Sequence, residues 1–275
     1  MKSFIEDVGF TEGPVVCQDG SIAATAIDRA HLTRTKDGKA SILARTGGGP
    51  NGLVEGREGF FVAQNGGIWP AVEKATAGVQ RVATDGSVSL VASGMTAPND
   101  LAFGPDGLLY VTDPTRTPER NDGRIWRLDV ESGRCEMILH CDWYPNGIGF
   151  GPDDRWIYVA DTGRRRLVRV PRDNPSPGAV ETLFTMDVGM PDGFAFDLDG
   201  NIVVAAVGVE EDEPGTVQVW SPDGRTREII ELGQSRFITN VAIGPDRRLY
   251  VCDSGNARLL AADWPCAGLP LHPFR

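Results

Sequence analysis

Short runs of alternating apolar and polar residues, separated by tight-turn sequences, recur along the whole chain. In residues 100–113, "DLAFG" and "LLYVTD" flank Pro105-Asp106-Gly107. In residues 124–141, "RIWRLDV" and "CEMILHC" flank Glu131-Ser132-Gly133. A period of two is typical of β-strands, and Asp-Gly or Ser-Gly between two such runs favours a tight hairpin turn. No segment has a convincing helical period, so the pattern predicts an all-β protein.

The hairpin pattern is itself repeated. In four segments a polar residue, the second letter quoted, opens an apolar strand that is followed by a tight turn and a second strand. They are "PNDLAFGPDGLLYVTDP", "PNGIGFGPDDRWIYVADT", "PDGFAFDLDGNIVVAAV" and "TNVAIGPDRRLYVCDS". Their opening residues are 47, 46 and 48 residues apart, and similar steps backwards reach two more. The six opening residues are Glu12, Asn51, Asn99, Asn146, Asp192 and Asn240. Six repeats of four short antiparallel strands predict a six-bladed β-propeller, one domain spanning residues 1–275.

The ends of the chain are expected to close this ring. The last repeat stops after three strands, near Trp264, while "KSFIEDV" precedes the first repeat and can supply the missing outer strand. The strand order also places the opening residues on the same rim as three longer loops, Gln64–Gly78, Pro114–Gly123 and Val207–Gly215. Long loops on a rigid scaffold often carry recognition, so this rim is the predicted working face.

Because each inner strand starts beside the channel, the six opening side chains are predicted to form a ring around its axis. Two carboxylates and four amides supply only oxygen donors of the kind that suit Ca²⁺, Mg²⁺ or Mn²⁺. The alternative is that Asn51, Asn146 and Asp192, each before Gly, cap turns through their own backbone. Glu12 is a poor turn residue, so the set as a whole favours a metal.

Charge and cysteine content limit the classes of partner and the cellular compartment that we expect. The net charge of −11 argues against nucleic acid or an anionic membrane as the main partner. The N-terminal segment has no apolar secretory region, and no apolar run has membrane-spanning length. Five cysteines, an odd number, match neither a disulfide framework nor a zinc motif. We therefore expect a cytoplasmic protein with reduced thiols, monomeric or weakly homo-oligomeric, that binds a small molecule.

The ordered motifs "TEGPVV", "PNDLAFGPDGLLYVTDP", "YPNGIGF" and "MPDGFAF", with the closing "WPCAGLPLHP", resemble the gluconolactonase, regucalcin and luciferin-regenerating-enzyme family. The resemblance implies a six-bladed propeller with one divalent metal, Ca²⁺ in first place and Zn²⁺, Mg²⁺ or Mn²⁺ as alternatives. It implies Glu12, Asn146 and Asp192 as metal ligands, Asp192 also as the acid/base, and Asn99 as a substrate contact or a further ligand. The chain departs from the family at Ala97, where some animal members carry a sugar-binding arginine.

The predicted activity is hydrolysis of a lactone, a sugar lactone or a related small one, at a metal in the central channel. Asn51 and Tyr144 join Asn99 as predicted substrate contacts. With Tyr144, the aromatic residues Trp69, Trp143 and Phe237 either form an apolar pocket wall on the working rim or pack between blades.

Two alternatives to the lactonase stay open. One is a metal-dependent phosphotriesterase-like hydrolase in which Asn99 is a fourth direct ligand. The other is a non-enzymatic binding module, because "YVADTGRRRLVRV" resembles blades of NHL-type propellers that dock proteins.

Overall fold

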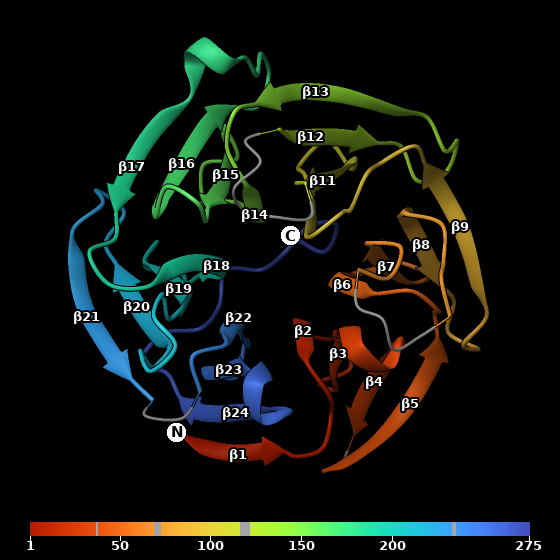
Figure 1. Cartoon of the computed structure of the whole chain (residues 1–275), viewed down its shortest axis with the longest axis horizontal. Helices are drawn as coiled ribbons and strands as arrows, with labels where there is room; N and C mark the ends of the chain where they lie inside the picture. The colour runs from red at the N-terminus through yellow and green to blue at the C-terminus, as the bar shows by residue number, and fades with distance from the viewer. Residues whose placement is uncertain (37, 69–72, 116–121, 233–234) are drawn as a thin grey trace.

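Six four-stranded antiparallel sheets surround a central channel in the computed structural model (Figure 1). The structure describes residues 1–36, 38–68, 73–115, 122–232 and 235–275. Blades one to three comprise β2 (Thr11–Val16), β3 (Ile22–Ala26), β4 (His31–Lys36) and β5 (Lys39–Arg45); β6 (Pro50–Gly56), β7 (Gly59–Gln64), β8 (Gly78–Val82) and β9 (Val88–Ser93); and β10 (Leu101–Phe103), β11 (Leu109–Asp113), β12 (Gly123–Leu128) and β13 (Cys135–Cys141).

Blades four to six follow the same order from the channel outwards. They comprise β14 (Pro145–Phe150), β15 (Trp156–Asp161), β16 (Arg166–Pro171) and β17 (Glu181–Thr185); β18 (Met190–Phe196), β19 (Ile202–Val207), β20 (Thr216–Trp220) and β21 (Thr226–Glu231); and β22 (Ile238–Ile243), β23 (Arg248–Asp253), β24 (Arg258–Asp263) and β1 (Lys2–Ile5). The described helices are single 3₁₀ turns: η1 (Ile27–Arg29), η2 (Pro177–Ala179) and η3 (Ser254–Asn256). None of these described helices is long and apolar enough to cross a membrane. The predicted all-β six-bladed propeller is confirmed.

The first strand of the chain closes the last blade, as predicted. β1 pairs antiparallel with β24, with Lys2 opposite Ala261 and Ser3 opposite Leu260. The strand ends at Ile5, earlier than the predicted segment, and the Val8 amide then donates a hydrogen bond of 2.8 Å to the Ala257 carbonyl. The ring is therefore closed by pairing of residues from the two ends of the chain.

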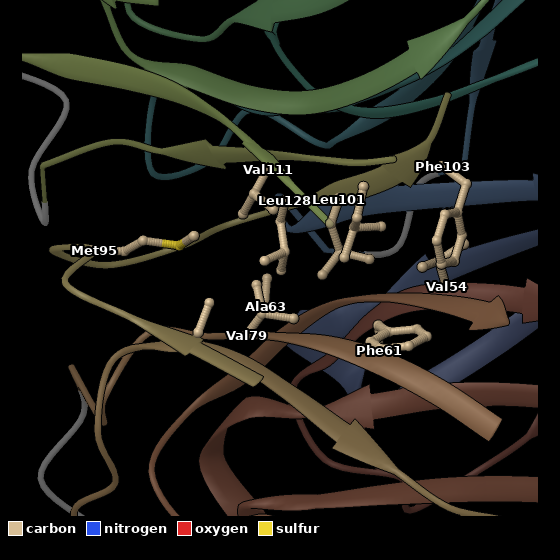
Figure 2. Close-up of a cluster of buried hydrophobic side chains, with 11 residues drawn as sticks. Val54, Phe61, Ala63, Val79, Met95, Leu101, Phe103, Val111 and Leu128 are labelled. Atoms are coloured by element: carbon tan, nitrogen blue, oxygen red, sulfur yellow. The ribbon is translucent and has the colours of Figure 1, made fainter. Parts of the chain in front are cut away.

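The hydrophobic core is divided among the six seams between neighbouring blades. Figure 2 shows the seam between blades two and three, where Val54, Phe61 and Ala63 face Leu101 and Phe103. Along β7 the side chains alternate, so that Phe60 and Val62 belong to the seam with blade one instead. A strand whose two faces are both buried needs apolar residues at successive positions. This explains why the second strand of each blade is more uniformly apolar than its neighbours.

The C-terminal segment crosses the channel at the end opposite the ring (Figure 1). It leaves blade six after β24, and the Leu269 amide donates to the Phe196 carbonyl at 2.9 Å. His272 then forms an isolated antiparallel bridge with Phe103 in blade three. The side chain of Arg275 reaches the Gly151 carbonyl at 3.1 Å in blade four. We call residues 265–275 the C-terminal strap, because they join blades on opposite sides of the channel.

Candidate active site and metal centre

A β-bulge aims the opening residue of five blades towards the channel axis. The pairing between first and second strands shifts register between Glu12 and Val15, Pro50 and Leu53, Pro145 and Ile148, Pro191 and Phe194, and Ile238 and Val241. A bulge adds a residue to one strand and re-directs the side chain at that point. Blade three differs: Asn99 lies just before β10, and its pairing is regular. The structure thus places the predicted ring at one end of the inner strands.

Glycine follows four of the six opening residues because the next blade is too close for a side chain. A Cβ on Gly13 would lie 2.9 Å from the Leu53 Cβ, and one on Gly52 would lie 2.6 Å from the Asp100 Cα. A Cβ on Gly193 would overlap the amide of Asn240. Glycine is the residue that permits such a close backbone approach. The two remaining positions hold Asp100 and Val241.

Hydroxyl groups from one blade hold the backbone of the next blade at its opening residue or at the residue just before it. Thr25 donates to the Asn51 carbonyl at 2.6 Å, and Thr112 donates to the Asn146 carbonyl at 2.7 Å. Thr162 donates to the carbonyl of Pro191, immediately before Asp192, at 2.7 Å. Ser254 donates to the carbonyl of Thr11, before Glu12, at 2.5 Å. Sequence reasoning missed these positioning residues, although a Thr or Ser at the end of the second strand recurs in "YVTDP", "VADT" and "VCDS".

The two predicted carboxylate ligands are each held by an amide from a neighbouring blade. Asn240 Nδ2 donates to Glu12 Oε2 at 3.0 Å, and the Gly13 amide donates to the same oxygen at 3.1 Å. The side chain of Asn146 forms a hydrogen bond with Asp192. Glu12 and Asn146 are buried, and Asp192 is partly exposed. The structure therefore brings together all three residues that the sequence predicted as ligands.

Asp100 is a third carboxylate in the channel, and the sequence analysis did not single it out. It stands where four other blades have glycine, and its carboxylate accepts the amides of Leu101 at 2.8 Å and Ile148 at 3.3 Å. Its recognition needed the alignment of the repeats to be extended by one position, from the opening residue to the residue after it. Among the six residues that follow the opening residues, four are glycine and Asp100 is the one that carries a charge.

Burial and mutual repulsion raise the pKa values of these acids. Burial raises the pKa of Glu12, opposed by the hydrogen bonds from Asn240 and Gly13. Burial, with a further contribution from the negative charge of Glu12, raises the pKa of Asp100 to about 7. Burial and then the charges of Glu12 and Asp100 raise the pKa of Asp192 well above its ordinary value. Strongly perturbed acids gathered in one place are typical of functional sites.

The donor set fits a hard divalent cation. Among the described residues, no lysine, arginine or histidine forms an ion pair with Glu12, Asp100 or Asp192. Like charges that share a poorly solvated site need an opposite charge or protons to coexist. The described residues contain no cluster of three or more His, Cys, Asp or Glu side chains arranged to hold a metal. The predicted ligand set contains two carboxylates, Glu12 and Asp192, and the side-chain amide of Asn146. All three offer oxygen, the donor that Ca²⁺ prefers.

The predicted substrate contacts and the rim aromatics differ in how deeply they are buried. Asn51 is buried, and its neighbour Gly52 donates its amide to the Asn99 carbonyl at 2.7 Å. Asn99 and Tyr144 are partly exposed. Of the rim aromatics, Trp143 is buried in the seam between blades three and four, which makes it a packing residue. Phe237 is 37% exposed and meets Phe10 edge to face, while Trp69 lies outside the described residues.

Comparison with known proteins shows the family to which the chain belongs. Residues 10–255 match the family model described as "SMP-30/Gluconolactonase/LRE-like region". The chain is 33% identical over 178 residues to 6-deoxy-6-sulfogluconolactonase from Pseudomonas putida, a match that covers 62% of this chain and 59% of that protein. It is 26% identical over 284 residues to gluconolactonase from Zymomonas mobilis, covering 91% and 78%. A solved structure of regucalcin from Agrobacterium tumefaciens, titled a calcium-binding protein, superposes with a TM-score of 0.77 at 23% identity, covering 97% and 94%.

Proposed function

Because the chain belongs to the SMP-30/gluconolactonase/LRE-like family, we propose that it is a divalent-metal-dependent lactonase acting on a sugar lactone or a related small lactone. The observation that carries this proposal is the pair of acids Glu12 and Asp192, held in one ring by Asn240 and Asn146. Three of the similar curated proteins are named as lactonases, which supports the reaction class.

Glu12, Asn146 and Asp192 would hold the cation, and Ca²⁺ suits their oxygen atoms best. A bound divalent cation would polarise the lactone carbonyl and lower the pKa of a water molecule beside it. Asp192 would accept the proton of that water as the water oxygen bonds to the carbonyl carbon. It would return the proton to the ring oxygen, which becomes a hydroxyl when its bond to that carbon breaks. In the metal-free protein, burial and the negative charges of Glu12 and Asp100 raise the pKa of Asp192 above its ordinary value.

The amides on the rim are assigned to the substrate. Asn99 and Asn51 would donate to or accept from the hydroxyl groups of the lactone, and Tyr144 would contact its ring. Ala97, with no charged or hydrogen-bonding side chain, contributes only a buried methyl group at its position. The substrate's polar groups would then be recognised by neutral amides rather than by an arginine.

Asp192→Asn and Glu12→Gln separate proton transfer from metal binding. The amide at position 192 keeps an oxygen for the ion but accepts no proton near neutral pH, so we expect metal retention and a loss of kcat on the order of 10²–10⁴-fold. Glu12→Gln loses a charge and should weaken metal affinity first, with partial recovery of activity in excess metal. The measurement is lactone hydrolysis against metal concentration, after elemental analysis of protein purified without added metal.

Two outcomes would contradict the proposal. Equal recovery of both variants in excess metal would mean that Asp192 acts only as a ligand. Wild-type protein that binds no divalent metal and hydrolyses no lactone in a panel of sugar and simple lactones would overturn the lactonase itself.

A further inference from the structure

A cavity of about 360 Å³ occupies the channel below the ring, on the far side from the predicted working face. All six inner strands contribute to its wall, and the C-terminal strap forms its floor through Leu269, His272 and Arg275. The strap is fixed by Asp154, whose Oδ1 lies 3.1 Å from His272 Nε2 and 3.0 Å from Arg275 Nη1. The lower chamber, as we call this cavity, has a volume in the range of small-molecule sites.

The wall of the lower chamber is aromatic. Phe103, Phe150, Phe194 and Phe196 line it from blades three, four and five. Phe194 and Phe196 meet edge to face with centroids 5.8 Å apart. Faces of aromatic rings attract organic cations when these are removed from water. A cluster of four phenylalanines therefore favours an apolar ligand, and a cationic one above a neutral one.

The roof of the lower chamber is acidic. Asp100 lines it, and its carboxylate accepts one amide on each oxygen, from Leu101 and Ile148, which leaves further acceptor sites on both oxygens. The charges of Glu12 and Asp192 act on the same region. The basic groups of the chamber, His272 and Arg275, lie at its floor and are engaged by Asp154. These basic groups do not compensate the negative charge at the roof. The roof therefore attracts a positively charged donor and repels an anion.

We propose that the lower chamber is a second ligand site, which binds a small organic ammonium ion with an aromatic or alicyclic body. Its ammonium group donates to Asp100 at the roof, and its body packs among the phenylalanines. The site does not depend on the proposed lactonase reaction, because the chamber and the rim lie on opposite sides of the ring.

Calorimetric titration of the full chain with 2-phenylethylamine tests this proposal. Two probes of similar size serve as controls: 2-phenylethanol removes the charge, and 3-phenylpropionate reverses it. We expect the amine to bind at least tenfold more tightly than the alcohol, and the anion to show no binding. Titrations repeated with saturating Ca²⁺ and a lactone product should still show amine binding, because those ligands occupy the other side of the ring, but with lower affinity, because the cation compensates the charges of Glu12 and Asp192.

One charge variant and two cavity-filling variants locate the binding. Asp100→Asn keeps the size of the side chain and should lose the tenfold preference for amine over alcohol. Ala242→Leu fills the chamber from β22, where Ala242 is partly exposed to the cavity, and should abolish binding of both. If Ala242→Leu fails to fold, Ala102→Leu fills the chamber from β10 on the other side and should likewise abolish binding of both. Equal affinity for all three probes, or amine binding unchanged in Asp100→Asn and in the filled variants, would overturn the proposal. Lactonase activity is not a readout in any arm, so failure of the proposed function would leave these results unaffected.

Discussion

Asn240 in the last blade donates a hydrogen bond of 3.0 Å to Glu12 in the first blade, across 228 residues of sequence. The bond joins the inner strands of blades six and one, whereas β1 closes the ring at the outer edge of blade six by pairing with β24. The bond fixes one oxygen of the proposed metal ligand. Correct closure of the ring and correct placement of Glu12 are therefore coupled.

Removal of this amide should weaken metal binding without unfolding the protein. In Asn240→Ala we expect Glu12 to lose its orientation, and metal affinity to fall by about 10- to 100-fold, as for other residues that orient a ligand. Excess metal should restore most of the activity. Metal titration followed by calorimetry measures the effect. Asn256→Ala is the matched control, because that amide binds Asp253 on the rim and not the ring. Equal metal affinity of Asn240→Ala and wild type would contradict the assignment.

The loop between β19 and β20 is tied to blade six and should influence substrate choice. Arg236 Nη2 binds the Gly208 and Val209 carbonyls at 3.1 and 2.9 Å, and the Glu213 carboxylate accepts the Val209 amide at 2.8 Å. Glu213→Ala frees the loop, so we expect a changed ranking of KM across a lactone panel with metal content unchanged. Glu211→Ala, an exposed change in the same loop, should leave the ranking as it is. Loss of metal in Glu213→Ala would show that the loop supports the metal site instead.

The N-terminal strand should contribute to the stability of the whole propeller. Phe4 meets Tyr250 edge to face at 5.2 Å and packs against the seam between blades six and one. Because Phe4 is only partly buried, Phe4→Ala should lower the free energy of unfolding by about 2–3 kcal/mol, at or below the lower limit of about 3 kcal/mol for truncation of a buried phenylalanine. Deletion of residues 1–8 exposes the edge of β24 and should have a larger effect. Denaturant unfolding measures both, with Ser3→Ala as the control. An unchanged midpoint for the deletion would show that β1 is dispensable.

Metal-free protein should lose stability as the pH rises from 5 to 8. In the unfolded chain Asp100 ionises near pH 4, whereas burial raises its pKa in the folded protein to about 7. The folded state thus binds more protons between these values, and its stability falls across this range, by up to about 3 kcal/mol between pH 5 and 8 for this group. Asp100→Asn has no such proton and should show a smaller decline. Unfolding in the presence of a chelator at several pH values tests this. Parallel curves for the two proteins would contradict the assigned pKa.

The sequence by itself determined the architecture of this protein. Alternation of apolar residues identified strands, turn residues separated them, and the spacing of the opening residues from Glu12 to Asn240 counted the blades. These features are local and repeated, so each copy reinforces the same prediction. The three-strand final repeat also determined that the N-terminal segment closes the ring. The ring of six opening residues followed from their equivalent places in the repeat, whereas the resemblance to the family singled out Glu12, Asn146 and Asp192 among them as predicted ligands.

Only the tertiary structure decided what surrounds those side chains. The bond from Asn240 to Glu12 joins opposite ends of the chain, and the close approach of Gly52 to Asp100 depends on the bulges that tilt the inner strands. The acidity of Asp100 depends on burial beside Glu12, which no local pattern encodes. The strap that closes the lower chamber is likewise defined by contacts of Arg275 with Asp154, 121 positions apart. Such features arise where separate repeats meet, because that is where packing, desolvation and charge act between residues distant in sequence.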